Sequence, residues 1–264
     1  MAGTMALLML AAPSDAGGNL IRLTDRADLL RWEAVGRIDM GGGAYCTGVL
    51  IASHLVLTAA HCVYDRQGRP RAPESMRFRA GLADGKALAE RRIARFVAHP
   101  GYDPTKRFGA EVIRHDVALL ELAELIPTSI ADPFILHQGA GNGQRVSVVS
   151  YGQGRDEALS WQRNCSVLGR GPGLIAFDCD VTHGSSGAPV FVQEHGRTRI
   201  LTLISGGTVE GGTPRAFGMD LPPLVERLRR DLRAMPMAPP TSGEIRRVRV
   251  GEQNHASGAK FAKP

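Results

Sequence analysis

Aromatic residues are scarce in this chain, and long apolar runs are missing. Only 5% of the 264 residues are Phe, Trp or Tyr, and no stretch of 18 consecutive apolar residues occurs. The second absence excludes a conventional membrane-spanning helix. The basic residues, mostly Arg, give a net charge of +6 but form no long single-sign block and do not alternate with aromatics. We therefore expect neither nucleic-acid binding nor stable membrane association.

Closely spaced cysteine pairs are also missing. The four cysteines, Cys46, Cys62, Cys165 and Cys179, include no C-x-x-C pair. This spacing argues against a structural metal site. No nucleotide-binding glycine loop is present either, so we expect neither a metal nor a cofactor. Two explanations of the cysteines stay open: four reduced thiols in a cytosolic protein, or two disulfides in one of three pairings. Export of the chain would favour the disulfides.

The two ends of the chain differ in composition from its middle. Residues 5–12, MALLMLAA, have the length and apolarity of a signal-peptide core, although no positive charge precedes them. Ser14 and Ala16 suit a cleavage site, so we expect a signal peptide over 1–16 and a secreted or periplasmic bacterial protein. An N-terminal segment, 17–30, follows. Residues 235–264 are rich in Pro, Gly, Ser, Lys and Arg, which predicts a disordered basic tail.

Short apolar runs between turn residues dominate the middle of the chain. They are seven to nine residues long, rich in Val, Ile and Leu, and typical of strands in an all-β sandwich or barrel. The runs lie at 45–52, 54–60, 92–99, 116–123, 145–152, 174–181, 188–194 and 199–207. One late segment differs, because residues 221–232 carry leucine and valine at helical spacing. We expect a surface helix there, packed on a barrel.

Three residues in this β-rich region carry types of side chain that work together in nucleophilic catalysis. His61 follows two alanines, Asp116 stands directly before an apolar run, and Ser186 lies between two glycines in GSSGAP. A serine hydroxyl needs an adjacent base, histidine can accept its proton, and a carboxylate can orient the imidazole. Taken singly, these residues are also explained as a core histidine, a turn aspartate and a turn serine.

Their order and neighbours resemble the chymotrypsin/trypsin-like serine peptidases, including the bacterial and glutamyl-endopeptidase-like branches. LTAAHC is similar to the histidine motif of that family, HDVALLEL to its aspartate motif and GSSGAP to its serine motif. SYGQG (150–154) and ISGG (204–207) resemble two further conserved strand segments. The resemblance covers about residues 31–234.

This resemblance implies two six-stranded antiparallel β-barrels, the first over 31–130 and the second, with a C-terminal helix, over 131–234. It implies a serine endopeptidase, a hydrolase that cleaves polypeptides through an acyl-enzyme, acting as a monomer. His61, Asp116 and Ser186 would form the triad, and the amides of Gly184 and Ser186 the oxyanion hole. The disulfides would pair Cys46 with Cys62 and, by subtraction, Cys165 with Cys179.

Substrate preference is indicated less directly. Asp180 lies six residues before Ser186, where the trypsin branch has an aspartate that attracts Arg or Lys, but it could equally be structural. His183 would lie on the rim of the same pocket and favour acidic side chains. Ser205, Gly206 and Gly207 are expected to pair with an extended substrate.

Ser185 departs from the family pattern and keeps other functions open. Many members carry an aspartate there, which pairs with an N-terminus released by zymogen cleavage; a serine cannot form that ion pair. We therefore predict no such activation. A catalytically inactive homologue that acts as a binding or regulatory module is the alternative. A third interpretation, a nucleic-acid or membrane-surface binder, rests on charge and the Arg-bearing tail alone.

Overall fold

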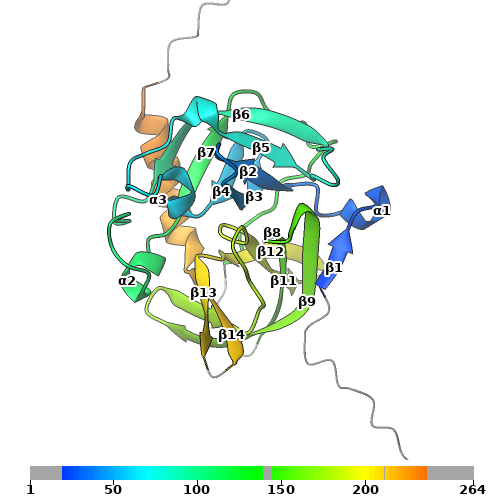
Figure 1. The fold of residues 1–264 in the computed structure, drawn as a ribbon, viewed down its shortest axis with the longest axis vertical. Coiled ribbons are helices and arrows are strands. Elements are labelled where there is room, and N and C mark those ends of the chain that lie inside the picture. The colour runs from blue at the N-terminus through cyan, green and yellow to red at the C-terminus, as the bar shows by residue number, and fades with distance from the viewer. Residues whose placement is uncertain (1–19, 139–143, 211, 237–264) are drawn as a thin grey trace, which may run out of the picture. The chain divides into compact units, whose positions relative to one another are not determined.

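A computed structural model describes residues 20–138, 144–210 and 212–236 (Figure 1). The predicted signal peptide, 1–16, lies outside the described residues, as does the predicted tail beyond residue 236. No helix among the described residues is long and apolar enough to cross a bilayer.

The first half of the chain folds into a closed antiparallel barrel of six strands. Their order is β2-β3-β4-β7-β6-β5, and β5 pairs back with β2. Fully buried side chains such as Ile38, Leu50 and Phe78 fill its interior. The barrel strands are β2 (Val35–Asp39), β3 (Tyr45–Ala52), β4 (Leu55–Thr58), β5 (Arg77–Ala80), β6 (Ala89–Ala98) and β7 (Ala118–Leu122).

Seven strands of the second half, joined by one strand from the N-terminal part of the chain, form one sheet of eight strands where six were expected. Its path is β12-β11-β8-β9-β10-β14-β13, and the N-terminal strand β1 (Leu20–Leu23) pairs with β9 beside that path. The count differs because β13 extends the β14 edge and β1 adds to β9. The other strands are β8 (Arg145–Gly152), β9 (Arg155–Gly171), β10 (Leu174–Phe177), β11 (Pro189–Glu194), β12 (Arg197–Leu203), β13 (Gly206–Glu210) and β14 (Thr213–Met219).

This second sheet curls so that β14 comes back to β12. The Thr202 hydroxyl donates to the Met219 carbonyl at 2.6 Å and accepts from the Met219 amide at 2.9 Å. Just beyond β12, the Ser205 amide donates to the Phe217 carbonyl at 2.9 Å. A buried threonine hydroxyl thus substitutes for part of a strand ladder where the two ends of the sheet meet.

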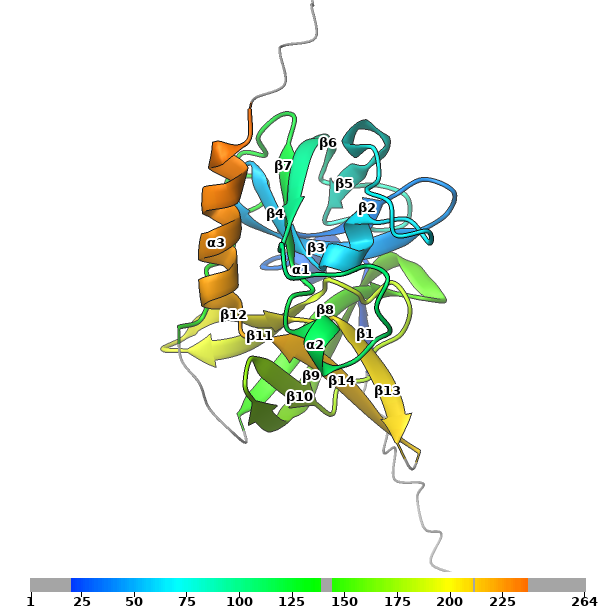
Figure 2. The ribbon, with the colours of Figure 1, turned by 90° about the vertical axis from the view of Figure 1, so that its left-hand side faces the viewer.

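Helices are short except at the C-terminal end. They are α1 (Arg26–Leu29), α2 (Ala110–Ile113), α3 (Leu221–Ala234) and two 3₁₀ turns, η1 (Ala60–Val63) and η2 (Pro73–Ser75). The predicted helix is present as α3, which buries one face made of Leu221, Val225, Leu228 and Leu232. That face packs on β6 and β7 and reaches β12 (Figure 2), so the helix fastens the second half of the chain to the first barrel.

An aromatic cluster also joins the two halves. The ring of Trp32 lies 5.1 Å from that of Phe191 on β11 and 5.0 Å from that of Trp161 on β9. Phe134, in the connection between the halves, lies 4.6 Å from Phe191. Tilted rings at these separations add attraction beyond their buried area, so the two halves meet across a packed interface.

Candidate active site

His61 and Asp116 lie at the same end of the first barrel because of the register between β4 and β7. Thr58, the last residue of β4, pairs with Ala118, the first residue of β7. His61 follows β4 on η1, and Asp116 precedes β7 by two residues. Two loops that are 55 residues apart in sequence therefore leave neighbouring strand ends.

Asp116 is buried and accepts three hydrogen bonds. Only 1% of its surface is exposed. It accepts from His61 Nδ1 at 2.8 Å and from the His61 amide at 2.9 Å. The third donor is the Ser205 hydroxyl at 2.5 Å, which comes from the second half of the chain. A buried carboxylate is tolerated when its lone pairs are satisfied in this way, and the bonds fix both the tautomer and the orientation of the imidazole.

The protonation of His61 is tuned by two opposing effects. Burial of the ring lowers its pKa, while the charge of Asp116 and the hydrogen bond to it raise the pKa. The carboxylate prevails, so the pKa of His61 lies above its ordinary value. A histidine with such a pKa accepts a proton more readily than a free imidazole does.

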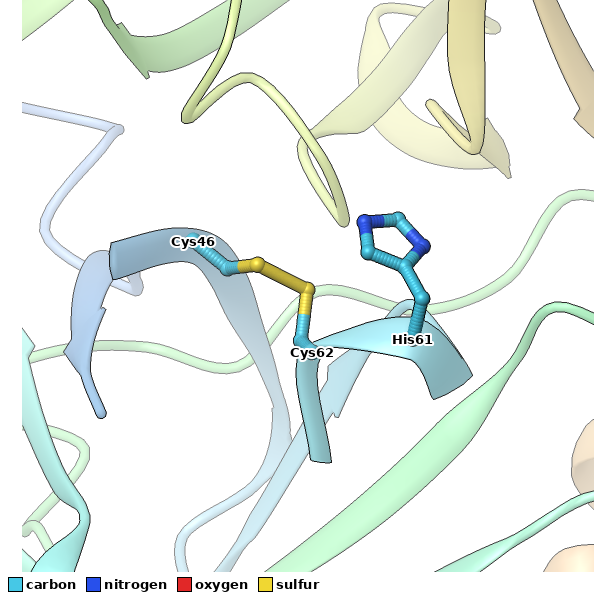
Figure 3. Close-up of side chains that lie close together, drawn as sticks. All are labelled: Cys46, His61 and Cys62. Carbon is cyan, nitrogen blue, oxygen red and sulfur yellow. A yellow bond between two sulfur atoms is a disulfide. The ribbon is translucent and has the colours of Figure 1, made fainter. Parts of the chain in front are cut away.

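A disulfide lies directly beside this histidine. Figure 3 shows the bond between Cys46 on β3 and Cys62 on η1 next to the His61 imidazole. Although the two sulfur atoms and the ring nitrogen lie close enough to hold a metal ion, the cysteines are bonded to each other and are not thiolate ligands. Cys165 and Cys179 form the second disulfide, so both expected pairings are present.

Ser186 lies on a turn, between β10 and β11, that needs its glycines. Gly184 and Gly187 have φ values of +88° and +75°, in the left-handed region that favours glycine. A Cβ on Gly184 would lie 2.2 Å from the Tyr45 ring, and one on Gly187 would lie 2.1 Å from Thr58 Oγ1. The turn therefore packs directly against the first barrel.

Thr47 on β3 fastens this turn to the barrel. Its hydroxyl donates to the Gly184 carbonyl at 2.8 Å and accepts from the Tyr151 amide at 3.0 Å. Its amide donates to the Ser186 carbonyl at 2.9 Å. Among the hydrogen bonds of the described residues, none uses the amides of Gly184 or Ser186 as donors. Both N–H groups thus remain available beside the serine.

Two cavities meet at Ser186. One, of about 750 Å³, is lined by His61, Gly184 and Ser186 together with Tyr64 and the Cys46–Cys62 bond. The other, of about 460 Å³, lies beside the strand that starts at Gly206. His183 and Gln153 line both cavities. The serine thus lies where an extended cleft passes between the two halves of the chain.

Of the residues expected to contact substrate, all but Asp180 line a cavity at Ser186. His183, Ser205, Gly206 and Gly207 all line the 460 Å³ cavity. The Ser205 side chain, however, points to Asp116, so only its backbone could meet a ligand. Asp180 is exposed and does not line this cavity. Its amide is bonded to Gln162 Oε1 at 2.8 Å, which holds this segment against β9 instead.

Sequence reasoning missed further residues in this region. Phe108 covers the start of β13, because a Cβ on Gly206 would lie 2.7 Å from its ring. Val181 and Thr182 complete the cavity wall. No local motif distinguishes Phe108 or Thr47, since their roles depend on contacts with residues far away in sequence. His115, next to Asp116, stacks on His99 with ring centroids 4.9 Å apart.

The fold and these motifs agree with a known family. The model of the trypsin-like peptidase domain matches residues 46–198, which is more than half of the chain. The chain therefore belongs to the trypsin-like peptidase domain family.

Individual relatives are more distant. Serine protease 56 of Mus musculus is 28% identical over 193 residues, which are 62% of this chain and 30% of that protein. A trypsin of Phaedon cochleariae is 34% identical over 80 residues, 30% of this chain and 28% of the relative. Hypodermin-A of Hypoderma lineatum is 25% identical over 173 residues, 58% of this chain and 65% of the relative. The chain thus spans only about 30% of the length of serine protease 56.

A solved structure of a Glu endopeptidase shares the fold. The two superpose with a TM-score of 0.68 at 21% sequence identity, over 82% of this chain and 97% of the other. At this identity the likeness concerns the fold of the backbone, a chymotrypsin-like arrangement, and says nothing of substrate.

Proposed function

We propose that this protein is a serine endopeptidase in which Ser186 is the nucleophile, His61 the general base and Asp116 the residue that orients His61. The observation that carries the proposal is the His61–Asp116 pair, joined at 2.8 Å in a buried setting. Within this pair, His61 lines the same cavity as Ser186. A base with a fixed tautomer beside a hydroxyl on a glycine turn is the arrangement that serine nucleophiles require.

In the first step, the Ser186 oxygen attacks the carbonyl carbon of the scissile peptide bond while His61 Nε2 takes the hydroxyl proton. The carbonyl oxygen becomes negative and is stabilised by the Gly184 and Ser186 amides, which have no partner among the hydrogen bonds of the described residues. The imidazolium then gives its proton to the leaving amine. Water, deprotonated by His61, releases the acyl group and restores the serine.

The substrate is proposed to be a polypeptide bound in extended form. β13 pairs with β14 on one side only, so the backbone of Gly206 and Gly207 offers an edge to which a peptide strand can add. In this proposal the second barrel of the chymotrypsin-like fold consists of the six strands β12, β11, β8, β9, β10 and β14. The hydrogen bond from Thr202 to Met219 closes it. The protein would act as a monomer.

The primary pocket, in our proposal, does not select Arg or Lys. The residues that line the 460 Å³ cavity include one titratable side chain, His183, and no carboxylate. Burial lowers the pKa of the Arg155 guanidinium, and the charge of the exposed Asp180 opposes that shift. Asp180 thus interacts with a cation of the protein itself. We expect acidic or uncharged side chains to be preferred before the cleaved bond.

The two disulfides support export of the protein. Both disulfides join residues close in sequence, with separations of 16 and 14. Such bonds persist in oxidising compartments, so we propose that the chain acts outside the cytosol.

Labelling with a fluorophosphonate probe tests the proposed activity. We expect the wild-type protein to be labelled, Ser186→Ala to be unlabelled, and His61→Ala to be labelled about 10³-fold more slowly. Ser147→Ala, a change to a half-buried serine on β8, is the matched control and should be labelled like the wild type. Absence of labelling in folded wild-type protein would favour the inactive binding module.

A further inference from the structure

Ser185, the neighbour of the proposed nucleophile, points into the protein. It is fully buried, and its Oγ lies 3.1 Å from Oγ of Ser150 on β8, which is also buried. The Thr182 amide donates to Ser185 Oγ at 3.4 Å. By the resemblance described above, this position corresponds to the aspartate that pairs with a released N-terminus in many chymotrypsin-like peptidases. Here two hydroxyl groups meet instead.

Arg155 extends this contact toward the protein surface. It is the first residue of β9 and pairs with Gly152, the last residue of β8. Its Nη1 donates to Ser150 Oγ at 3.4 Å. The glycine makes room for it, because a Cβ on Gly152 would lie 2.6 Å from the guanidinium carbon. The charge of Asp180, in the segment that leads into the serine turn, favours the charged form of the guanidinium and opposes the lowering of its pKa by burial.

The hydrogen-bonding capacities of these groups suggest one direction of donation. Arginine and the Thr182 amide can only donate. With Arg155 donating to Ser150 and Ser150 donating to Ser185, both hydroxyl oxygens accept and every contact is used. The three distances, 3.1, 3.4 and 3.4 Å, are longer than those of typical protein hydrogen bonds. Burial of the two serines reduces competition from water for these contacts.

We propose that Arg155, Ser150 and Ser185 form an anchor that holds the turn 184–187 in the geometry needed for its two amide donors. This inference rests on the proposed peptidase function and extends it. The anchor takes the place of the ion pair between the usual aspartate and a cleaved N-terminus. Its three side chains all belong to the second half of the chain, so the proposed anchor does not use a released N-terminus. None of the three side chains lines the cavity walls at Ser186, so we call them positioning residues.

Disturbing the anchor should affect the transition state more than substrate binding. The oxyanion amides bind charge that develops only during the reaction, whereas an extended peptide is held by the edge of β13. A loosened turn should therefore lower kcat and leave KM nearly unchanged. A change that merely weakened the fold would lower the melting temperature without this selective effect.

The test uses a double-mutant cycle on the full-length protein. Ser185→Ala and Ser150→Ala should each lower kcat about tenfold, with KM within about twofold of the wild type. Because the two hydroxyls act through one contact, the double variant should lose no more than the stronger single variant. Ser147→Ala on the same strand is the control. Independent losses that multiply in the double variant, or an unchanged kcat in Ser185→Ala, would overturn the anchor.

Arg155 supplies a second comparison if either serine variant fails to fold. Arg155→Met removes the charge and the donors at similar length and should lower kcat as Ser150→Ala does. Arg155→Lys keeps the charge and should retain more activity. Equal activity of Arg155→Met and the wild type would refute the role of the arginine.

Hydrogen exchange keeps this test independent of catalysis. The amides of Ser185, Gly187 and Ala188 are bonded to Thr182, Ile204 and Ser185 carbonyls. We expect the segment 178–191 to exchange faster in Ser185→Ala and Arg155→Met than in the wild type or Ser147→Ala. Unchanged exchange would overturn the anchor even in a protein without peptidase activity, whereas inactive wild type with the expected exchange would refute only the proposed function.

Discussion

The two halves of the molecule position their parts of the candidate site in different ways. In the first half, His61 and Asp116 leave adjacent ends of a closed barrel, and a disulfide joins η1 to β3 beside them. In the second half, Ser186 lies on a turn outside any strand. The disulfide of this half joins Cys165 to Cys179 and does not hold that turn to a strand. Strand register thus fixes His61, the proposed base, whereas Ser186, the proposed nucleophile, depends on contacts with other parts of the chain.

This difference indicates where the site is vulnerable. The His61–Asp116 pair is a property of one barrel, completed by a single hydroxyl from the other half. The serine turn relies on Thr47 across the interface and on Ser150 beneath it. Changes within the first barrel should therefore affect proton transfer, and changes at the interface should affect the placement of the serine.

The largest effect is expected from the carboxylate of the first barrel. Asp116→Asn should lower kcat about 10⁴-fold, because an amide cannot hold His61 in the tautomer that accepts the serine proton. Steady-state hydrolysis of a peptide library substrate measures it, with melting temperature as the check on folding. Loss of less than about tenfold in folded protein would show that His61 is not held through Asp116.

A smaller effect should follow from breaking the link between the halves. Thr47→Val keeps the shape of the side chain but leaves the Gly184 carbonyl and the Tyr151 amide without their partner. Unpaired buried groups cost about 1–3 kcal/mol each, so leaving two of them should lower the free energy of unfolding by at least about 2 kcal/mol. Because the hydroxyl holds the serine turn, kcat should fall as well.

Thr47→Ser is the control for that change, since it retains the hydroxyl. Denaturant unfolding and kcat should both stay closer to the wild type than in Thr47→Val. If Thr47→Val lost stability but kept its full kcat, the interface would not be what positions Ser186.

The smallest expected effect is a shift in the pH dependence of kcat/KM. The proposed mechanism needs neutral His61, and Asp116 raises the pKa of His61 above the ordinary value of 6.5. The rate kcat/KM should therefore rise with pH through a midpoint above 6.5. The stabilising contribution of protonated His61 is complete below its unfolded pKa and is lost as pH rises through the folded pKa.

A pH–rate profile and titration of the His61 resonances measure the two values. In Asp116→Asn the midpoint should move down, because the carboxylate that raises the pKa is gone while burial, which lowers it, remains. A wild-type midpoint below 6.5 would contradict the upward shift of the His61 pKa.

Parts of the fold were predictable where burial leaves a clear pattern. The apolar runs at 45–52 and 145–152 coincide with β3 and β8, and the helical spacing from 221 predicts α3. By contrast, β9 spans 17 residues that include five charged side chains, and many of its positions stay exposed or half-buried although it pairs with β8, β10 and β1. An apolar-run criterion misses such a strand, and it misses the glycine-rich β13 for a similar reason.

The candidate site divides in the same way. Motifs indicate His61, Asp116 and Ser186 because each motif encodes a local backbone that the residue needs. The environment of Asp180 was not predictable, since its amide is bonded to Gln162 and its charge acts on Arg155, and both residues belong to the strand that the pattern missed. The part of Thr47 depends on a turn 137 residues away, a distance that no short motif encodes.

The Ser205 hydroxyl and the Asp116 carboxylate that it satisfies come from opposite halves of the chain. A chain cut between the halves, within residues 123–133, would give one fragment that carries the Asp116 carboxylate and another that carries the Ser205 hydroxyl. Recovery of hydrolysis would then require the fragments to find one another, at a rate set by their concentrations. Because each fragment supplies one partner of this hydrogen bond, hydrolysis by the cut protein would report how readily the two fragments associate.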